Sequence, residues 1–349
     1  MTSVLARRAQ RGGVRARDPR AAVPMPLAFG FATLAALLAI ASLCIGARHI
    51  PVAEIWDALI NHDPASPVHD IIRERRIPRT MVALIAGASL SLAGALLQTM
   101  TRNPLADTGV LGVNAGAAFL AAVTLSVLGW SSPVLFVLAA LTGAALTIGL
   151  ISKIGKNEFG TLDPLKIVLA GVAIGAVLEG VSDGLTLVDP QVFARVRGWL
   201  LGSVDVTGYS AIGIVSAGLV VGIALIVPIL GSINQLAMGE DSAAALGVNV
   251  RRTRLLLLLA VTVLASTTTA AVGVFTFVGL ATPHIIRRMG FYADRQLIIL
   301  SALAGPSLVL AADILGRVIV RSELPASVVV AFIAGPILIA LAQKEGLYR

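Results

Sequence analysis

Long apolar runs constrain this chain more than any other feature of its sequence. Ten runs of 14 to 23 residues follow one another, bounded by charged residues or by proline and glycine. A helix needs about 20 apolar residues to cross a bilayer. Only 13% of the residues are charged, against about 25% in soluble domains, so little chain remains for a water-soluble domain. We therefore expect an all-α polytopic membrane protein whose ten transmembrane helices are 27–47, 80–99, 109–129, 133–152, 165–187, 208–230, 255–275, 277–290, 297–316 and 324–342.

Basic residues indicate how these helices are oriented. A net charge of +8 would suggest nucleic acid in a soluble protein, but in a membrane protein it first reports which loops face the cytoplasm, so no nucleic-acid partner is expected. With a cytoplasmic N-terminus and ten spans, 18 of the 27 Lys and Arg residues fall inside. We expect a basic, disordered cytoplasmic tail over 1–26, one transmembrane domain over 27–349, and both termini on the cytoplasmic side of a multi-pass inner-membrane protein.

Small residues and prolines mark how the helices pack and bend. Ala83, Gly87, Ser91 and Ala95 recur at a spacing of four, which predicts a stripe that lets two helix backbones approach closely in lipid. Three prolines fall inside predicted helices, where each removes a backbone hydrogen bond and favours a kink or hinge. They are Pro283, Pro306 and Pro336.

No residue pattern in the chain indicates catalysis or metal binding. The sequence contains no phosphate-binding Gly-x-x-x-x-Gly-Lys-Ser/Thr loop and no His-Glu-x-x-His motif, and its single cysteine excludes a cysteine-based metal cage. His62 and His69 lie near prolines in a polar segment, which favours a solvated loop over a metal site. We therefore expect neither an enzyme nor a resident metal or cofactor.

Two carboxylates lie within the predicted helix 165–187. Glu179 and Asp183 continue the spacing of Gly171 and Gly175, so both lie on one face. Carboxylates are costly in the membrane and rarely face lipid, which indicates a water-accessible pathway or a polar packing site. Proton coupling is the alternative, because like charges at this spacing raise a pKa, and it would make the protein a secondary transporter.

The connection before the predicted helix 255–275 contains a short segment with helix signals at both ends. Glu240 and Asp241 are favourable at a helix amino terminus, alanines follow, and Gly247 can adopt the left-handed conformation that ends a helix. The pattern predicts a helix of about two turns over 239–247, presented to the cytoplasm as a docking element. An ordinary ordered loop is the alternative.

Arginines crowd the predicted outer side, against the usual charge rule. Arg73, Arg75, Arg76 and Arg79 precede the second helix. Their aliphatic stems could lie along apolar surface while the charged groups reach the membrane–water interface, or the arginines could meet an acidic partner. Arg317 has Asp313 one helical turn earlier, so a local ion pair is expected there.

Taken together, these segments resemble the FecCD family of ABC importer permeases, which work with a substrate-binding protein. Within the family, the stretches 98–107, 178–180 and 316–320 look most similar to permease subunits of the ferric-enterobactin type. The chain departs from the family pattern at 293–295 and at Ser327. The matching stretches are 76–80, 94–98, 102–107, 109–116, 169–173, 239–248, 277–284, 312–317 and 323–325.

The resemblance implies the BtuC-like fold of type II ABC importer permeases, with ten helices in each of two subunits and two separate ATPase subunits that bind ATP and Mg. The second permease subunit is expected to be a related chain rather than an identical one. The cargo is expected to be a ferric siderophore, of catecholate type, delivered by the binding protein. Haem and cobalamin are the alternatives within the family.

The resemblance also implies roles for individual residues. Arg76, Arg79 and Arg317 match positions that meet acidic groups of the binding protein. Gln98 and Asn114, with Glu179 and Asp183, are candidates for lining the translocation pathway. The segment 239–247 matches the coupling helix that rests on the ATPase, and its candidate contact residues are Gly239, Glu240, Asp241, Ala244, Leu246 and Gly247.

Overall fold

A computed structural model shows that regular structure in the described part of the chain is helical. It describes residues 23–46, 50–61, 63, 65–126, 133–156, 164–188, 196, 198–237, 239–320 and 323–345. Most of the predicted basic tail lies outside these residues. The all-α class predicted from the apolar runs is confirmed for the part described.

The long helices follow the predicted apolar runs, each of which contains a helix. They are α2 (Met25–Cys44), α5 (Ile77–Thr101), α6 (Val113–Ser126), α7 (Pro133–Ile154), α8 (Pro164–Val188), α10 (Ser210–Ile226), α13 (Val250–Val272), α14 (Val278–Arg288), α15 (Asp294–Ile319) and α16 (Ala326–Glu345). Short elements connect them: α3 (Val52–Ile60), α4 (Pro67–Asp70), the π-helical turn η1 (Ile71–Arg76), the 3₁₀ turns η2 (Thr108–Leu111) and η3 (Val227–Ile229), α11 (Leu230–Ala237) and α12 (Glu240–Ala245).

Seven helices in the described residues are long and apolar enough to cross a membrane. The other three predicted spans do not meet this criterion. α14 has 11 residues and α6 has 14, and within α16 the apolar stretch Ala326–Pro336 has between 10 and 17. The count of ten spans therefore stays a prediction, while the polytopic helical architecture is established.

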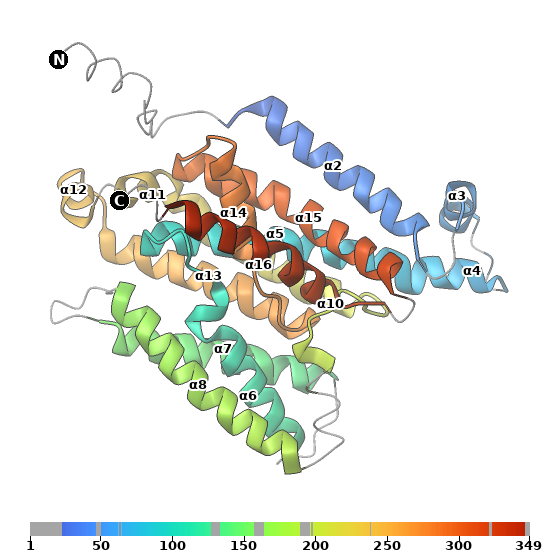
Figure 1. Ribbon diagram of the computed structural model, residues 1–349, viewed down its shortest axis with the longest axis horizontal. Helices are drawn as coiled ribbons and strands as arrows, with labels where there is room; N and C mark the ends of the chain where they lie inside the picture. The colour runs from blue at the N-terminus through green and yellow to red at the C-terminus, as the bar shows by residue number, and fades with distance from the viewer. Residues whose placement is uncertain are drawn as a thin grey trace.

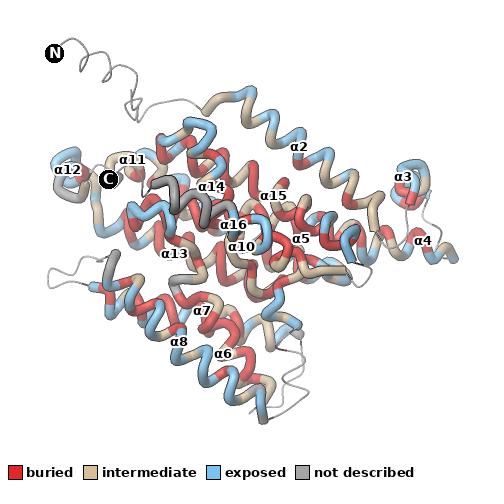
Figure 2. The backbone as a smooth tube through the Cα atoms, viewed as in Figure 1, coloured by how far each residue is buried: buried red, intermediate tan, exposed pale blue. Residues whose placement is uncertain are grey.

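α5 and α15 form the centre of the bundle (Figure 1). In the apolar 18-residue stretch of the segment Pro67–Thr101, 78% of the residues are buried, whereas in that of α2 only 11% are. Figure 2 shows this contrast between the centre and the edges. α2 lies along one side against α15, and α6, α7 and α8 lie on the other (Figure 1). A helix this exposed inside an apolar protein faces lipid or a partner chain.

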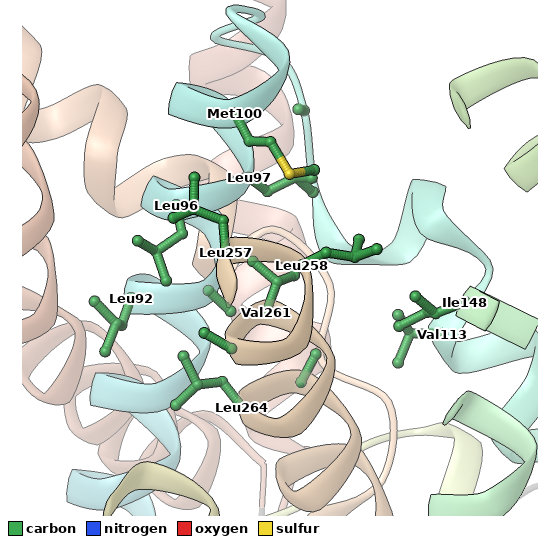
Figure 3. Close-up of a cluster of buried hydrophobic side chains, with 14 of the residues drawn as sticks. Leu92, Leu96, Leu97, Met100, Val113, Ile148, Leu257, Leu258, Val261 and Leu264 are labelled. Atoms are coloured by element: carbon green, nitrogen blue, oxygen red, sulfur yellow. The ribbon is translucent and has the colours of Figure 1, made fainter. Parts of the chain in front are cut away.

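The larger hydrophobic core joins the centre to one flank. In Figure 3, leucines of α5 face Leu257, Leu258 and Leu264 of α13, while Val113 of α6 and Ile148 of α7 continue the cluster. A second core joins α5 to α10, α14, α15 and α16. Because α5 contributes to both cores, it is the element around which the others are arranged.

The predicted small-residue stripe of α5 lies where its neighbours approach closely. All four residues, Ala83, Gly87, Ser91 and Ala95, are buried. A Cβ added to Gly87 would lie 2.6 Å from the carbonyl oxygen of Gly305 in α15. The stripe is therefore a helix-packing face, as expected for small residues in membrane helices.

The three helix prolines lie inside helices, as predicted from the sequence. Pro283 lies in α14, Pro306 in α15 and Pro336 in α16. Pro306 follows Gly305, at a close approach of α5 and α15. Hinge motion at these prolines stays a prediction.

Replacing Gly94 by alanine should destabilise the packing of α5 on α14. The new Cβ would lie 2.0 Å from the carbonyl oxygen of Gly279, so the backbones must separate, at a cost of about 1–3 kcal/mol. Gly180 of α8 is the matched control, because a Cβ there meets nothing within 4 Å and alanine favours helix. We expect Gly94→Ala to lower the thermal unfolding temperature in detergent and Gly180→Ala to keep or raise it. Equal temperatures for the two variants would contradict the close approach.

Candidate functional site

Arg79 is the centre of an ion-pair cluster at the end of the bundle that carries α3 and α4. Its Nη2 lies 2.8 Å from Oδ1 of Asp313 in α15, and its Nη1 lies 2.7 Å from Oε2 of Glu323 and 3.2 Å from Oδ1 of Asp205. The Asp313 side chain is 1% exposed, whereas that of Asp205 is 56% exposed. One buried carboxylate and two nearer the surface therefore share a single guanidinium group.

Arg317 completes the buried part of the cluster. Its Nη2 donates to Oδ2 of Asp313, one turn earlier in α15, which confirms the local ion pair predicted from the spacing. Its Nη1 donates to the carbonyl oxygens of Ser42 and Ile45 at 2.9 and 2.8 Å. Asp313 thus lies between two buried cations, and one of them also contacts the end of α2.

Arg76 contacts the same end of α2. Its Nη1 donates to the carbonyl oxygens of Cys44, at 2.9 Å, and Leu43. Carbonyl groups of the last helical turn lack intrahelical partners, and the dipole at this end favours positive charge. Two guanidinium groups therefore hold the carboxyl end of a helix that is otherwise exposed.

The three arginines expected to meet a binding protein are thus engaged within their own chain. Arg76, Arg79 and Arg317 are 7%, 7% and 8% exposed. Asp205, Asp313 and Glu323 pair with Arg79, and Asp313 also pairs with Arg317. The structure brings the three arginines together, and docking at this end stays a proposal.

The predicted helix over 239–247 is present as α12, at the opposite end of the bundle (Figure 1). Gly247 has a φ of 81°, and the N–H groups of Gly247 and Val248 donate to the carbonyl oxygens of Ala244 and Ala243, the Schellman pattern that ends a helix. Ala244 and Leu246 are exposed. The glycine-terminated helix predicted from the sequence is confirmed.

The amino end of α12 also has an unusual backbone. Gly239 has a φ of 123°, a conformation that favours glycine over residues with a side chain. The backbone of Glu240 and Asp241 belongs to α12, while their side chains lie outside what the structure describes. The predicted electrostatic role of these two acids therefore stays a prediction.

Two hydrogen bonds link α11, the segment before α12, to the central helices, and a third joins these two central helices to each other. Arg102 ends α5 with a left-handed φ of 52°, and its Nη2 donates to the carbonyl oxygen of Leu236 in α11 at 2.9 Å. Asn234 of α11 accepts from the backbone N–H of Arg295 in α15 at 3.3 Å. Thr99 of α5 donates to Asp294 of α15 at 3.2 Å. α11 is therefore connected to both central helices.

Asp107 organises the connection between α5 and α6. Its carboxylate accepts hydrogen bonds from the backbone N–H groups of Thr108, Gly109 and Phe277. Phe277 has a φ of 66°, which non-glycine residues rarely adopt. Burial raises the pKa of the Asp107 carboxyl above its usual value, although the three N–H groups favour the charged form. The connection is therefore held against the start of α14.

The candidate pathway residues fall into two groups. Gln98 is 2% exposed, donates to the carbonyl oxygen of Gly279 at 3.2 Å and accepts from Arg287, while Asn114 accepts from Thr269 at 3.2 Å. Glu179 and Asp183 are both exposed on α8, as their spacing predicted for one face. The first pair therefore packs between helices of this chain, and the second lies on its surface.

The possible histidine metal site is only partly described. His69 accepts a hydrogen bond from the backbone N–H of Asp63 at 3.0 Å, and its Nε2 lies 3.7 Å from Asp57. His62 lies outside the described residues. Within the described part of the chain, no three side chains of His, Cys, Asp or Glu gather as a metal site would require.

Sequence reasoning missed several of the groups that build these sites. Asp205, Glu323 and Asp107 are isolated acids in connections, and no local spacing pairs them with a cation. Arg102 and Asp107 belong to the matching stretch 102–107 and Glu323 to 323–325, but the sequence assigns none of them a partner. An acid next to a membrane span is itself a signal, because burial there requires a partner, but the sequence does not name that partner.

Comparison with known proteins identifies the family. Residues 34–344 match the FecCD transport family. The chain is 40% identical over 304 residues to the ferric enterobactin transport system permease protein FepD of Escherichia coli strain K12, covering 87% of this chain and 91% of that protein. It is 32% identical over 313 residues to the iron(3+)-hydroxamate import system permease protein FhuB of Bacillus subtilis strain 168, covering 89% and 81%.

A solved structure agrees with this similarity at the level of the fold. It is an ABC transporter described as of metal-chelate type, in an inward-facing conformation. The TM-score is 0.79, with 24% sequence identity, over 91% of this chain and 99% of the solved one. With its sequence matched over residues 34–344 and 40% identical to a permease protein over 304 residues, the chain belongs to the FecCD transport family.

Proposed function

We propose that this chain is the permease subunit of an ATP-driven ABC importer that moves a ferric siderophore, of catecholate type, across the cytoplasmic membrane. The observation that carries the proposal is the 40% identity to the Escherichia coli ferric enterobactin permease over 91% of its length. The hydroxamate and citrate permeases among the similar relatives are 30 to 36% identical. The family is one of transport proteins, so the chain itself catalyses no bond chemistry.

The proposed assembly contains a second, related permease subunit, two ATPase subunits that bind ATP and Mg, and an extracytoplasmic binding protein. α12 contacts an ATPase on the cytoplasmic side, where both termini also lie. Its exposed Leu246 and Ala244 are suited to a groove. Because Arg102 and Asn234 link α11 to α5 and α15, displacement of α12 would move both central helices.

The arginine cluster lies at the other end of the same two helices and faces the binding protein in this proposal. Arg79 already has carboxylate partners, and two of these, Asp205 and Glu323, are 56% and 31% exposed. Carboxylates of the docking protein would therefore exchange with Asp205 and Glu323 rather than meet an unoccupied cation. Such an exchange costs less than exposing a buried pair, because surface ion pairs contribute about 0–1 kcal/mol.

Uptake by iron-starved cells tests the cargo. Cells lacking this chain should fail to take up a labelled ferric catecholate, and a plasmid copy should restore uptake, while uptake of ferric hydroxamates, haem and cobalamin should not depend on it. Uptake of haem or cobalamin instead would reassign the cargo within the family. Uptake that survives deletion of the partner ATPases and collapses with the proton gradient would favour a secondary transporter that uses Glu179 and Asp183.

A further inference from the structure

α3 presents an apolar face that the rest of the described chain does not cover. Val52, Trp56, Leu59 and Ile60 are 60%, 66%, 44% and 60% exposed. At about 100° per residue these positions gather on one side of the helix. Four large apolar side chains on nine residues are more than scattered surface exposure explains.

The other sides of α3 have different environments. Ile55 and Ala58 are 6% and 0% exposed and pack in a small core with Val68 and Ile72. Glu54 and Asp57 lie away from both apolar groups, and Asp57 accepts a hydrogen bond from Asn61. α3 therefore has one face for the protein, one for an apolar medium and one for water.

α3 is fixed in this orientation by its neighbours. Arg73 donates from Nε to the carbonyl oxygen of Ala58 and from Nη2 to that of Leu59, both at 3.0 Å, so a cation caps the carboxyl end of the helix. Tyr209 in turn donates to the carbonyl oxygen of Arg73 at 3.0 Å. The apolar face is thus held in place and does not turn inward.

The position of α3 relative to α2 points to what covers this face. α2 has 20 residues, the length that crosses the hydrocarbon core once, and its exposed side chains include Leu34, Leu37 and Ile40. Its carboxyl end is bound by two arginines, and α3 follows eight residues later, beyond that end of α2 (Figure 1). α3 therefore lies beside the point where a bilayer-spanning α2 would leave the hydrocarbon core.

We propose that α3 is an interfacial anchor that lies in the outer leaflet, with Val52, Trp56, Leu59 and Ile60 buried among the lipids. Tryptophan favours this depth in membrane proteins, and an amphipathic helix at the interface buries its apolar face about 5–10 Å below the headgroups. α3 carries two acids and no basic residue, so its insertion is hydrophobic and does not require anionic lipid. The proposal does not depend on the cargo.

Tryptophan fluorescence of the full chain in bilayers tests this placement. The sequence has three tryptophans, so replacing Trp130 and Trp199 by phenylalanine leaves Trp56 alone. Lipids brominated along the acyl chain should quench Trp56, most strongly when the bromines lie about 5–10 Å below the headgroups. Adding anionic lipid to the bilayer should leave this quenching of Trp56 unchanged.

The matched control moves the tryptophan to the water face of the same helix. In the same protein, Trp56→Phe combined with Glu54→Trp should show little quenching by brominated lipid and strong quenching by aqueous iodide. If the protein lacking Trp130 and Trp199 does not fold, the unchanged protein is compared with the single variant Trp56→Phe. The lipid quenching that the variant loses is then the contribution of Trp56. Equal lipid quenching at positions 54 and 56, or shielding of Trp56 only when the binding protein is added, would overturn the proposal.

Discussion

Asp313→Asn should lower the free energy of unfolding by about 3–5 kcal/mol, the cost of leaving buried charge uncompensated. Its carboxylate is 1% exposed and pairs with both Arg79 and Arg317. Asparagine keeps the shape but loses the negative charge, so two guanidinium groups remain buried with less compensation. The loss should be measurable by chemical unfolding of the purified protein in mild detergent.

Asp205→Asn is the matched control, because it removes a different carboxylate from the same cation. Its Oδ1 is 3.2 Å from Arg79 Nη1, but its side chain is 56% exposed. An exposed pair contributes about 0–1 kcal/mol, so this variant should unfold nearly as the unchanged protein does. Similar losses for the two variants would show that burial of Asp313 does not determine the stability of the cluster.

The same substitution should be visible locally at Cys44, the single cysteine. Arg76 and Arg317 hold the last carbonyl groups of α2, including that of Cys44. When Asp313 is replaced, Arg317 loses the partner that orients it, and the end of α2 should loosen. We expect faster labelling of Cys44 by a maleimide in Asp313→Asn than in Asp205→Asn, under conditions in which both remain folded.

What could be predicted from the sequence depended on whether the signal was local. The long helices follow from continuous apolar runs, and α12 follows from glycine at a helix end, because both signals lie within a few residues. The Arg317–Asp313 pair was predictable for the same reason, since one helical turn separates the two residues. Arg79 and Asp313 are 234 positions apart, and no local pattern could pair them.

Interruptions inside the apolar runs were harder to place. The run 109–129 begins with the turn η2, and α6 starts only at Val113, because Gly112 takes a left-handed φ of 65°. Pro228 lies in η3, where α10 gives way to α11, since proline cannot supply the next backbone donor. Hydropathy alone does not distinguish such turns from helix, which is why the run boundaries and the element boundaries differ.

The internal use of Arg76, Arg79 and Arg317 also changes how docking must be tested. Replacing Arg76 and Arg79 by glutamate would place a carboxylate beside Asp313 at position 79 and would remove the cation that holds the end of α2 at position 76, so lost uptake could reflect instability alone. Asp205 and Glu323 are the better probes, because they are accessible and contact Arg79. In the proposed docking, these two acids are the groups that carboxylates of the binding protein replace on Arg79.

In the importer proposed above, Arg102→Gln should reduce transport per ATP hydrolysed about tenfold or more. The reason is the link from Arg102 to the Leu236 carbonyl oxygen, one of the two hydrogen bonds described above between α11 and the central helices. A hydrogen bond to a charged group contributes about 1.5–3 kcal/mol, and about 1.4 kcal/mol corresponds to a tenfold change in an equilibrium. ATP hydrolysis by the partner subunits should continue, because α12 itself is unchanged.

The second contact supplies both a test and a control for this coupling. Asn234 accepts from the backbone N–H of Arg295, so Asn234→Ala should uncouple transport as Arg102→Gln does, whereas Asn234→Asp keeps an acceptor and should retain most of the coupling. Arg295→Gln leaves that backbone donor in place and should transport normally. Unchanged transport per ATP in both Arg102→Gln and Asn234→Ala would show that displacement of α12 reaches α5 and α15 through other contacts. A parallel loss of ATP hydrolysis would instead assign Arg102 to assembly of the complex.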